Sequence, residues 1–328
     1  MQNVICAKPR RDTCAVVSLP CLAHCIAPAA SSKPLQRAPA LKFLSCIVAL
    51  FLGWLPAAQA EQSVYTIDQY SRLVACPARF EAACPAKREV ECPPQTATTA
   101  VLLVIGQSNA ANGGERRVKT RFPDRVLNYF DGHCFVAGSP LLGSGGTEGE
   151  FITLLADNLI ANGTYKSVMI IATAISGSQI SRWQKGGDLN QLMLSTVIGF
   201  KSQYKITDIV WHQGEGDYML GTTAQAYTAS FQSMRKTLTD IGVAAPIFIS
   251  ISTFCGTEKP WQRDNPIAQA QGQLADPKAK ILLGANTDQL LVSADRRKND
   301  QCHFSDSGQR KTASAYAIAI KDFHASRP

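Results

Sequence analysis

The stretch AVLLVIGQSNA, residues 100–110, begins with an apolar run that stops at a glycine and continues with polar residues. Such a short apolar run is typical of a strand buried on both faces in a parallel sheet. Gly106 permits a tight turn from this strand into a helix, with the Ser108 hydroxyl exposed and its backbone N–H near the helix N-terminus. Two interpretations of Ser108 stay open at this point, a nucleophile and a helix cap.

The same alternation continues from about residue 99 to the end of the chain. Short β-branched runs alternate with longer amphipathic stretches, which indicates βαβ units. The expected strands cover residues 100–106, 125–131, 167–175, 208–213, 246–252 and 280–284, and the expected helices cover residues 151–162, 189–204, 223–241, 266–274 and 307–323. We predict an α/β fold, a three-layer α/β/α sandwich with a doubly wound, mainly parallel sheet of five or six strands. Ligands of such sheets bind beyond the carboxyl ends of the strands.

Residues 1–60 have a different character from the rest of the chain. The apolar run FLSCIVALFLGWL, at 43–55, follows Lys42 and precedes PAAQA, in which Ala58 and Ala60 form a small-x-small cleavage pattern. We predict a signal peptide with an unusually long n-region that is cut after Ala60, and an uncleaved membrane anchor is the alternative. A cleaved chain is expected to be periplasmic or secreted, without stable insertion in a membrane.

The charge distribution argues against a nucleic-acid partner. Residues 1–60 hold six Lys or Arg and one Asp, so five of the eight net positive charges lie there and three remain after cleavage. The remaining sequence has no basic stripe and no nucleic-acid-binding motif. We therefore expect no nucleic-acid partner.

The cysteines predict disulfides and not a metal site. Six of the 11 cysteines follow residue 60, at positions 76, 84, 92, 134, 255 and 302, and an even set in an exported protein favours disulfides. The segment CPARFEAACPAKREVECPP predicts a Cys-Pro-rich arm over residues 61–98, ahead of a domain at 99–328. No Cys-x-x-Cys spacing occurs, so zinc is not expected.

A serine nucleophile requires a base, and four histidines follow residue 60. His133 lies in a turn, and His324 lies at the end of the last expected helix, where it can interact with the helix dipole. His303 lies in the loop NDQCHFSDSG, with Asp300 three residues before it. That spacing allows an acid to orient the histidine ring from within one turn, although D-x-x-H is also common by chance.

Two more polar segments follow expected strands. AISGSQISRW, at 174–183, contains Gly177, which is either an oxyanion donor through its N–H or a simple turn glycine. VWHQGEGD, at 210–217, groups polar side chains that are costly to bury without partners, so it is expected to line a cleft. His212 and Glu215 lack the H-E-x-x-H spacing of zinc proteases, and we predict no metal and no cofactor.

The ordered set GQSNA, ISGS, WHQGEGD and DQCH resembles the SGNH-hydrolase superfamily. Within it, the set is similar to the sialate O-acetylesterase-like group, which is related to acetylxylan esterases, and the match covers residues 100–319. The resemblance implies Ser108 as nucleophile, His303 as general base and acid, and Asp300 as its orienting carboxylate. It also implies an oxyanion hole built from the backbone N–H groups of Ser108 and Gly177 and the side-chain amide of Gln213.

The activity that this resemblance implies is removal of O-acetyl groups from carbohydrates through an acetyl-serine intermediate. Gln107, Asn109, Glu215 and Asp217 are expected to orient loops or to line the substrate pocket. An O-acetyltransferase, which passes the acetyl group to a sugar hydroxyl, is the nearest alternative. A noncatalytic glycan-binding domain is a more distant one, because a binding domain has no use for a complete triad.

Cys302 stands between the aspartate and the histidine of DQCH, and Cys255 follows the strand expected at 246–252. We hypothesise that these two cysteines form a disulfide that fixes the catalytic loop to the neighbouring strand end. A buried thiol is the alternative.

Overall fold

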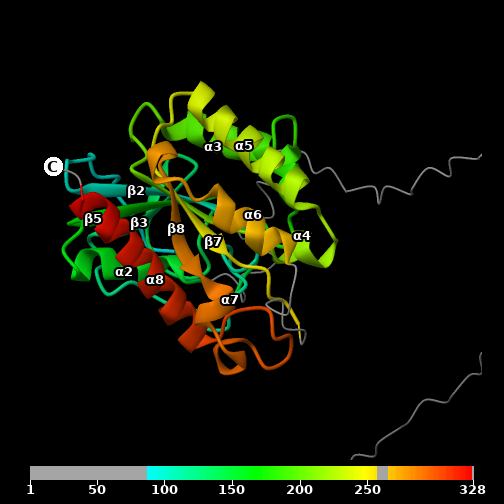
Figure 1. Cartoon of the computed structure of the whole chain (residues 1–328). Coiled ribbons are helices and arrows are strands. Elements are labelled where there is room, and N and C mark those ends of the chain that lie inside the picture. The colour runs from blue at the N-terminus through cyan, green and yellow to red at the C-terminus, as the bar shows by residue number, and fades with distance from the viewer. Residues whose placement is uncertain (1–86, 257–264, 327–328) are drawn as a thin grey trace, which may run out of the picture. The chain divides into compact units, whose positions relative to one another are not determined.

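The structure is a computed structural model that describes residues 87–256 and 265–326 (Figure 1). The predicted signal peptide, most of the predicted arm at 61–98, Cys76 and Cys84 lie outside the described residues. No helix within the described ranges has the length and apolarity needed to cross a membrane.

An eight-stranded sheet forms the middle layer of the fold (Figure 1). Its strands are β1 (Glu89–Val90), β2 (Thr99–Gly106), β3 (Val126–Phe130), β4 (His133–Val136), β5 (Ser167–Ala172), β6 (Asp208–His212), β7 (Ile247–Ile251) and β8 (Ile281–Asn286), in the spatial order β1-β4-β3-β5-β2-β6-β7-β8. Strands β3, β5, β2, β6, β7 and β8 run parallel, and they are the six strands that the sequence predicts. The predicted α/β fold with a mainly parallel sheet is confirmed.

Two short antiparallel strands extend the sheet beyond the prediction. A two-residue loop joins β3 to β4, and both of its residues, Asp131 and Gly132, have positive φ angles of 49° and 85°. Asp-Gly is a favoured pair for such a tight hairpin. Strand β1 then pairs with β4, and a disulfide between Cys92 and Cys134 links the segment after β1 to β4.

Helices cover both faces of the sheet (Figure 1). They are α2 (Ile152–Ala161) and α8 (Asp306–Ala325) on one face and α3 (Asp188–Phe200), α5 (Ala224–Asp240) and α6 (Pro266–Leu274) on the other, with the short helices α4 (Glu215–Met219) and α7 (Thr287–Leu290) at strand ends. Side chains of β2 alternate between the two layers, so that Leu102 packs with α2 and α8 whereas Leu103 packs with α3, α5 and α6. Both leucines are fully buried, and the core is therefore continuous through the central strand.

The turn after β2 differs from the predicted helix start. Ala110 and Ala111 both donate their backbone N–H to the Gln107 carbonyl, and no regular helix follows until α2. The side chains of Asn109 and Asn112 bond to distant loops instead of lying on a helix surface. Asparagine side chains that bond to backbone groups compete with helix formation, which explains the irregular loop.

Candidate active site

The candidate site residues after the strands lie at the carboxyl edge of the sheet. Ser108, Gly177 and Gln213 follow β2, β5 and β6, and β2 lies between the other two strands. The backbone joins the three strand ends, because Gln107 N–H donates to the His212 carbonyl at 3.0 Å and Ile175 N–H donates to the Gly106 carbonyl at 2.9 Å. Segments that are far apart in sequence thus meet where ligands of parallel sheets bind.

Gly106 allows β2 and β6 to approach closely at this edge. Its φ angle is +142°, and a Cβ at this position would overlap the carbonyl oxygen of His212. Only glycine adopts this backbone conformation readily and leaves room for the neighbouring strand. The position of Ser108, two residues later, therefore depends on a glycine.

Asp300 and His303 form a pair within one turn. His303 Nδ1 lies 2.9 Å from Asp300 Oδ2, and Asp300 Oδ1 accepts the backbone N–H groups of Cys302, at 2.9 Å, and His303, at 3.0 Å. Burial raises the pKa of Asp300, but these hydrogen bonds, led by that from His303, lower it below its ordinary value. An ionised carboxylate beside Nδ1 assigns the ring proton to Nδ1, which leaves Nε2 as the acceptor.

The acceptor edge of the His303 ring lies beside the Ser108 turn. A Cβ added to Gly113 would lie 2.6 Å from the Ser108 carbonyl oxygen and 2.9 Å from His303 Cδ2, the atom bonded to Nε2. No hydrogen bond joins Ser108 Oγ to His303 in the described part of the chain. Such catalytic hydrogen bonds are often long in ligand-free proteins and tighten when substrate binds. Ser108 is 6% exposed and the His303 side chain 27%, so the site opens to solvent on the histidine side.

Asn109 links the serine turn to the histidine turn. Its Oδ1 accepts the backbone N–H of Phe304 at 3.1 Å, and its Nδ2 donates to the carbonyl of Cys302 at 3.3 Å. These two partners are the residues on either side of His303. Asn109 is 1% exposed, so both bonds are shielded from water. The side chain that follows Ser108 therefore fixes the position of His303.

Glu215 lies behind Asn109. Its Oε1 accepts from Asn109 Nδ2 at 2.9 Å and lies 3.6 Å from Nε2 of His212, which also contacts Ser252 Oγ at 3.1 Å. Burial raises the pKa of Glu215, but the interactions with His212 and Asn109 outweigh it and hold the pKa below its ordinary value. Across residues 87–256 and 265–326, no group of three or more His, Cys, Asp or Glu side chains is arranged to hold a metal ion.

Gln107 joins the first polar segment to the third. Its Oε1 accepts the backbone N–H groups of Gly214 and Gly216, each at 3.2 Å, and the side chain is 3% exposed. A Cβ on Gly216 would lie 3.9 Å from the Gly177 carbonyl oxygen, so the second and third segments also pack together. Gln107 thus contacts the third segment through two backbone groups, and its role at the site stays a prediction.

The expected oxyanion donors differ in their availability. The backbone N–H groups of Ser108 and Gly177 make no hydrogen bond within the described ranges, and Gly177 has a φ angle of +67° in an exposed turn. Gln213 is fully buried, and its Nε2 donates to the Ser178 carbonyl at 3.1 Å and to Asp217 Oδ2, while its Oε1 has no partner among the described residues. The amide N–H groups of Gln213 are engaged, so the structure does not present this side chain as a free donor.

Asp217 holds the second and third segments together. It accepts the backbone N–H of Ile180 at 2.8 Å and the hydroxyl of Thr222 at 2.7 Å, in addition to the Gln213 amide. Burial raises its pKa despite these hydrogen bonds. Asp217 thus contacts both segments, and its role at the site stays a prediction.

Two arginines that the sequence-based prediction missed brace the histidine turn. Arg297 donates from a terminal nitrogen to the Gly113 carbonyl at 3.1 Å, and its Nε lies 3.8 Å from Asp300 Oδ2. Arg296 is 3% exposed and donates to the Cys302 carbonyl at 3.0 Å. The paired arginines in ADRRKNDQCH, directly before the turn, were the available signal.

A disulfide joins Cys255 to Cys302, which is the hypothesised pairing. Cys302 precedes His303, and Cys255 follows β7. The link therefore ties the residue before the histidine to a neighbouring strand end. The other histidines lie elsewhere: His133 is exposed and pairs with Glu89 at 2.7 Å, and His324 lies at the opposite end of the sheet.

A serine turn, an Asp-His pair and free backbone donors thus lie at the carboxyl edge of a parallel sheet. Residues 98–322 match the family described as carbohydrate esterase, sialic acid-specific acetylesterase. The chain belongs to this family. A search of curated proteins finds no match.

Solved structures with the same fold include a protein from Arabidopsis thaliana, which is 16% identical, with a TM-score of 0.53 over 71% of this chain and 99% of that one. NanS is 20% identical, with a TM-score of 0.49 over 72% of this chain and 100% of that one. A carbohydrate acetylesterase from Xanthomonas citri is 15% identical, with a TM-score of 0.44 over 70% of this chain and 57% of that one. At these identities the likeness to the first structure shows a shared fold and nothing more.

Proposed function

We propose that the protein is a serine esterase that removes O-acetyl groups from carbohydrates, with Ser108 as nucleophile, His303 as base and acid, and Asp300 as orienting carboxylate. The observation that carries the proposal is the double hydrogen bond of Asn109. Its side chain binds the residues on both sides of His303 while its backbone continues directly from Ser108. These two bonds hold the Ser108 turn next to a histidine whose ring is oriented by Asp300, which is the arrangement that a serine nucleophile requires.

The mechanism follows from the contacts. Ser108 Oγ attacks the acetyl carbonyl carbon while His303 Nε2 takes the hydroxyl proton. The backbone N–H groups of Ser108 and Gly177 stabilise the negative charge that develops on the carbonyl oxygen. His303 then gives its proton to the departing sugar oxygen, and water, activated by the same Nε2, releases acetate from the acetyl-serine.

Gln213 supports this oxyanion hole indirectly, through the backbone next to Gly177. Its Nε2 bond to the Ser178 carbonyl fixes the turn that carries Gly177, and its bond to Asp217 fixes its own position. A direct bond to the oxyanion, which the resemblance implies, requires the Gln213 amide to leave these partners. We therefore propose two backbone donors and a positioning role for Gln213.

The substrate and location follow from the family and from the disulfides. The family supports an acetylated carbohydrate as substrate, and the acetyl ester is the reacting group. Two disulfides fit an oxidising compartment, which supports a periplasmic or secreted protein whose leader is removed.

Ser108→Ala tests the proposal against the matched exposed control Ser202→Ala. We expect Ser108→Ala to lower acetate release from p-nitrophenyl acetate and from O-acetylated glycans by roughly 10,000-fold without changing the melting temperature. Equal activity of wild type and Ser108→Ala contradicts the proposal. Acetyl loss from the donor that exceeds free acetate, together with newly acetylated sugar, identifies a transferase instead.

A further inference from the structure

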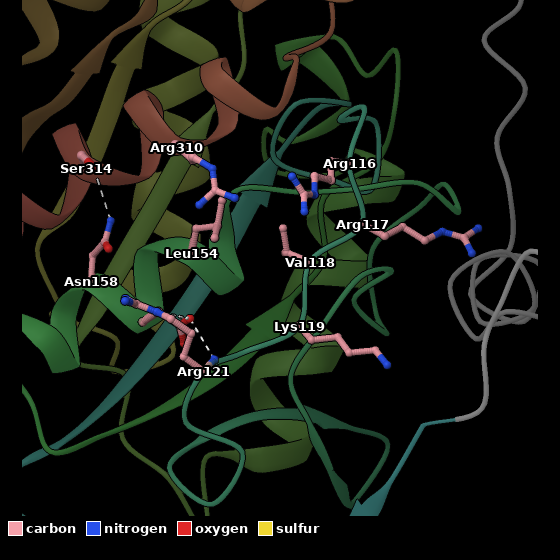
Figure 2. A pocket seen from close by; sticks show the side chains of 10 residues that line it. Arg116, Arg117, Val118, Lys119, Arg121, Leu154, Asn158, Arg310 and Ser314 are labelled. Carbon is pink, nitrogen blue, oxygen red and sulfur yellow. Dashed lines mark hydrogen bonds and ion pairs between the residues drawn. The ribbon is translucent and has the colours of Figure 1, made fainter.

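A basic pocket lies on the face of the fold that carries α2 and α8 (Figure 2). It has a volume of about 450 Å³ and is bounded by the loop at 116–121, by α2 and by α8. Its cationic lining includes Arg116, Lys119, Arg121 and Arg310. In Figure 2, Arg116 and Arg310 lie toward one end of the pocket, and Arg121 and Lys119 lie toward the other.

Two walls of this pocket, the loop at 116–121 and α8, follow in the chain from the segments of Ser108 and His303. The loop wall leaves the site at Gly113, which contacts His303, and reaches Arg116 three residues later, at most about 11 Å of chain. The α8 wall begins at Asp306, three residues after His303, and carries Arg310 on its second turn. Each wall thus begins within three residues of a segment that holds the candidate site.

The pocket is held in shape without a ligand. Gln309, 1% exposed, accepts the backbone N–H of Arg116 at 3.0 Å and donates to its carbonyl at 3.0 Å. Asp157, also 1% exposed, accepts the backbone N–H of Arg121 at 3.0 Å and its Nε at 3.2 Å. Because these backbones are fixed, binding does not have to order them.

Positive charge exceeds negative charge among these residues. Asp157 pairs with Arg121, and Asp306 is shared by Arg116 and Arg310, each at 3.2 Å. Lys119 makes no ion pair with any residue in the described ranges. Two carboxylates are therefore the ion-pair partners of three of these four cations, and guanidinium groups match the planar geometry of a further carboxylate.

We propose that this pocket binds the carboxylate groups of an acidic polysaccharide whose neighbouring O-acetylated unit reaches Ser108. The inference rests on the proposed function and adds the substrate class to it. A polymer fits better than a single sugar, because the walls that carry these cations continue in the chain from the Ser108 and His303 segments, whereas none of the cations bonds to Ser108 or His303. A polyuronate of this kind carries repeated negative charge at a spacing of one per sugar unit.

The test compares acetylated polygalacturonate with the same polymer after methyl esterification of its carboxylates. The pocket variant combines Arg116→Gln, Lys119→Gln and Arg310→Gln. The control combines Lys201→Gln, Lys236→Gln and Lys321→Gln, three exposed lysines elsewhere, with the same change in net charge. Neither set includes a residue of the catalytic machinery.

We expect the pocket variant to lose about tenfold in kcat/KM on the carboxylated polymer, as the sum of three partly exposed charge interactions. Its activity on p-nitrophenyl acetate and on the methyl-esterified polymer should stay within about twofold of wild type, and the wild-type preference for the carboxylated polymer should weaken with added salt. Equal wild-type kcat/KM on the two polymers, or an equal loss in the control, overturns the proposal.

Binding of unacetylated polygalacturonate, measured by calorimetry with Ser108→Ala, separates the two proposals. Binding that the pocket variant abolishes supports the pocket even where p-nitrophenyl acetate is not hydrolysed, in which case the proposed function alone fails. Tighter binding of inorganic phosphate or of a single-stranded oligonucleotide than of polygalacturonate, at equal salt, contradicts the assignment to a glycan.

Discussion

Among the residues that the structure describes, two Asp-His pairs lie at opposite ends of the same sheet. At the carboxyl edge, Asp300 Oδ2 lies 2.9 Å from His303 Nδ1. At the amino edge, Asp208 Oδ1 lies 2.7 Å from His324 Nε2. The distance between carboxylate oxygen and ring nitrogen is shorter in the second pair, so distance alone would favour His324 as the base. Of the two pairs, however, only the first lies beside a serine turn and free backbone donors.

The surroundings explain the difference. Asp208 is the first residue of β6, fully buried, and accepts the Tyr165 hydroxyl at 2.7 Å as well as His324. Burial and the charge of Asp208 raise the pKa of Tyr165, so its hydroxyl stays a donor. This trio ties the end of α8 to the start of a strand. Of these two pairs, Asp300 and His303 lie next to the Ser108 turn, whereas Asp208 and His324 join two secondary-structure elements.

The largest expected effect separates the two histidines. His303→Ala should lower kcat on p-nitrophenyl acetate by about 100- to 10,000-fold, because the base is lost, with little change in melting temperature. His324→Ala should leave kcat within about twofold but lower stability by about 1–3 kcal/mol, because Asp208 loses a partner. Kinetics and thermal unfolding of both variants measure this, and a comparable loss of kcat in His324→Ala refutes the comparison.

The next effect separates two glycines. Gly106→Ala should destabilise the protein by more than about 3 kcal/mol, because a Cβ overlaps the His212 carbonyl and the φ angle is unfavourable. Gly163, near the amino edge, also has a positive φ, but a Cβ added there would meet no atom within 4 Å. Gly163→Ala should cost only about 1–2 kcal/mol. Urea unfolding compares them, and similar costs disprove the close-approach argument.

A smaller effect separates two buried hydrogen-bonding side chains. Asn109→Ala should lower kcat by about tenfold. Loss of the bonds to Cys302 and Phe304 removes about 1–3 kcal/mol of free energy that holds the His303 turn in place, and about half of that range accounts for a tenfold lower rate. Tyr165→Phe removes one hydroxyl from the amino-edge trio and should lower stability by a similar amount with unchanged kcat. Steady-state kinetics and melting curves test both, and full activity of Asn109→Ala removes the main support for the proposed site.

The smallest expected effect concerns pH. The folded pKa of Asp300 lies below its ordinary value of about 3.9. Its contribution to stability is therefore present above pH 4 and lost as the pH falls through the folded pKa. The difference in melting temperature between wild type and Asp300→Asn should narrow below about pH 4. Asp124→Asn, whose side chain is 90% exposed, serves as control, and a pH-independent difference for Asp300→Asn contradicts this.

The sequence predicts the strands well because buried parallel strands are continuous apolar runs, as in β2. It also contains the signal for β4 in YFDGHCFV, where Asp131 and Gly132 form the hairpin, but the four-residue strand is too short for periodicity to show it. The loop after Ser108, where Gly106 would also permit a helix to start, is irregular because the Asn109 side chain bonds to a loop 193 residues away, which no local pattern encodes. The contact of Gln213 with Asp217 spans only four residues, but it depends on side-chain conformations that the sequence pattern does not give.

The disulfide between Cys255 and Cys302 gives the histidine turn a dependence on redox state. Cys302 is bonded to His303 through the chain, and its carbonyl receives both Asn109 and Arg296. Before the two thiols are oxidised, this turn lacks its covalent anchor to the segment after β7. We therefore expect the His303 turn to be held most firmly under oxidising conditions, in which this disulfide persists.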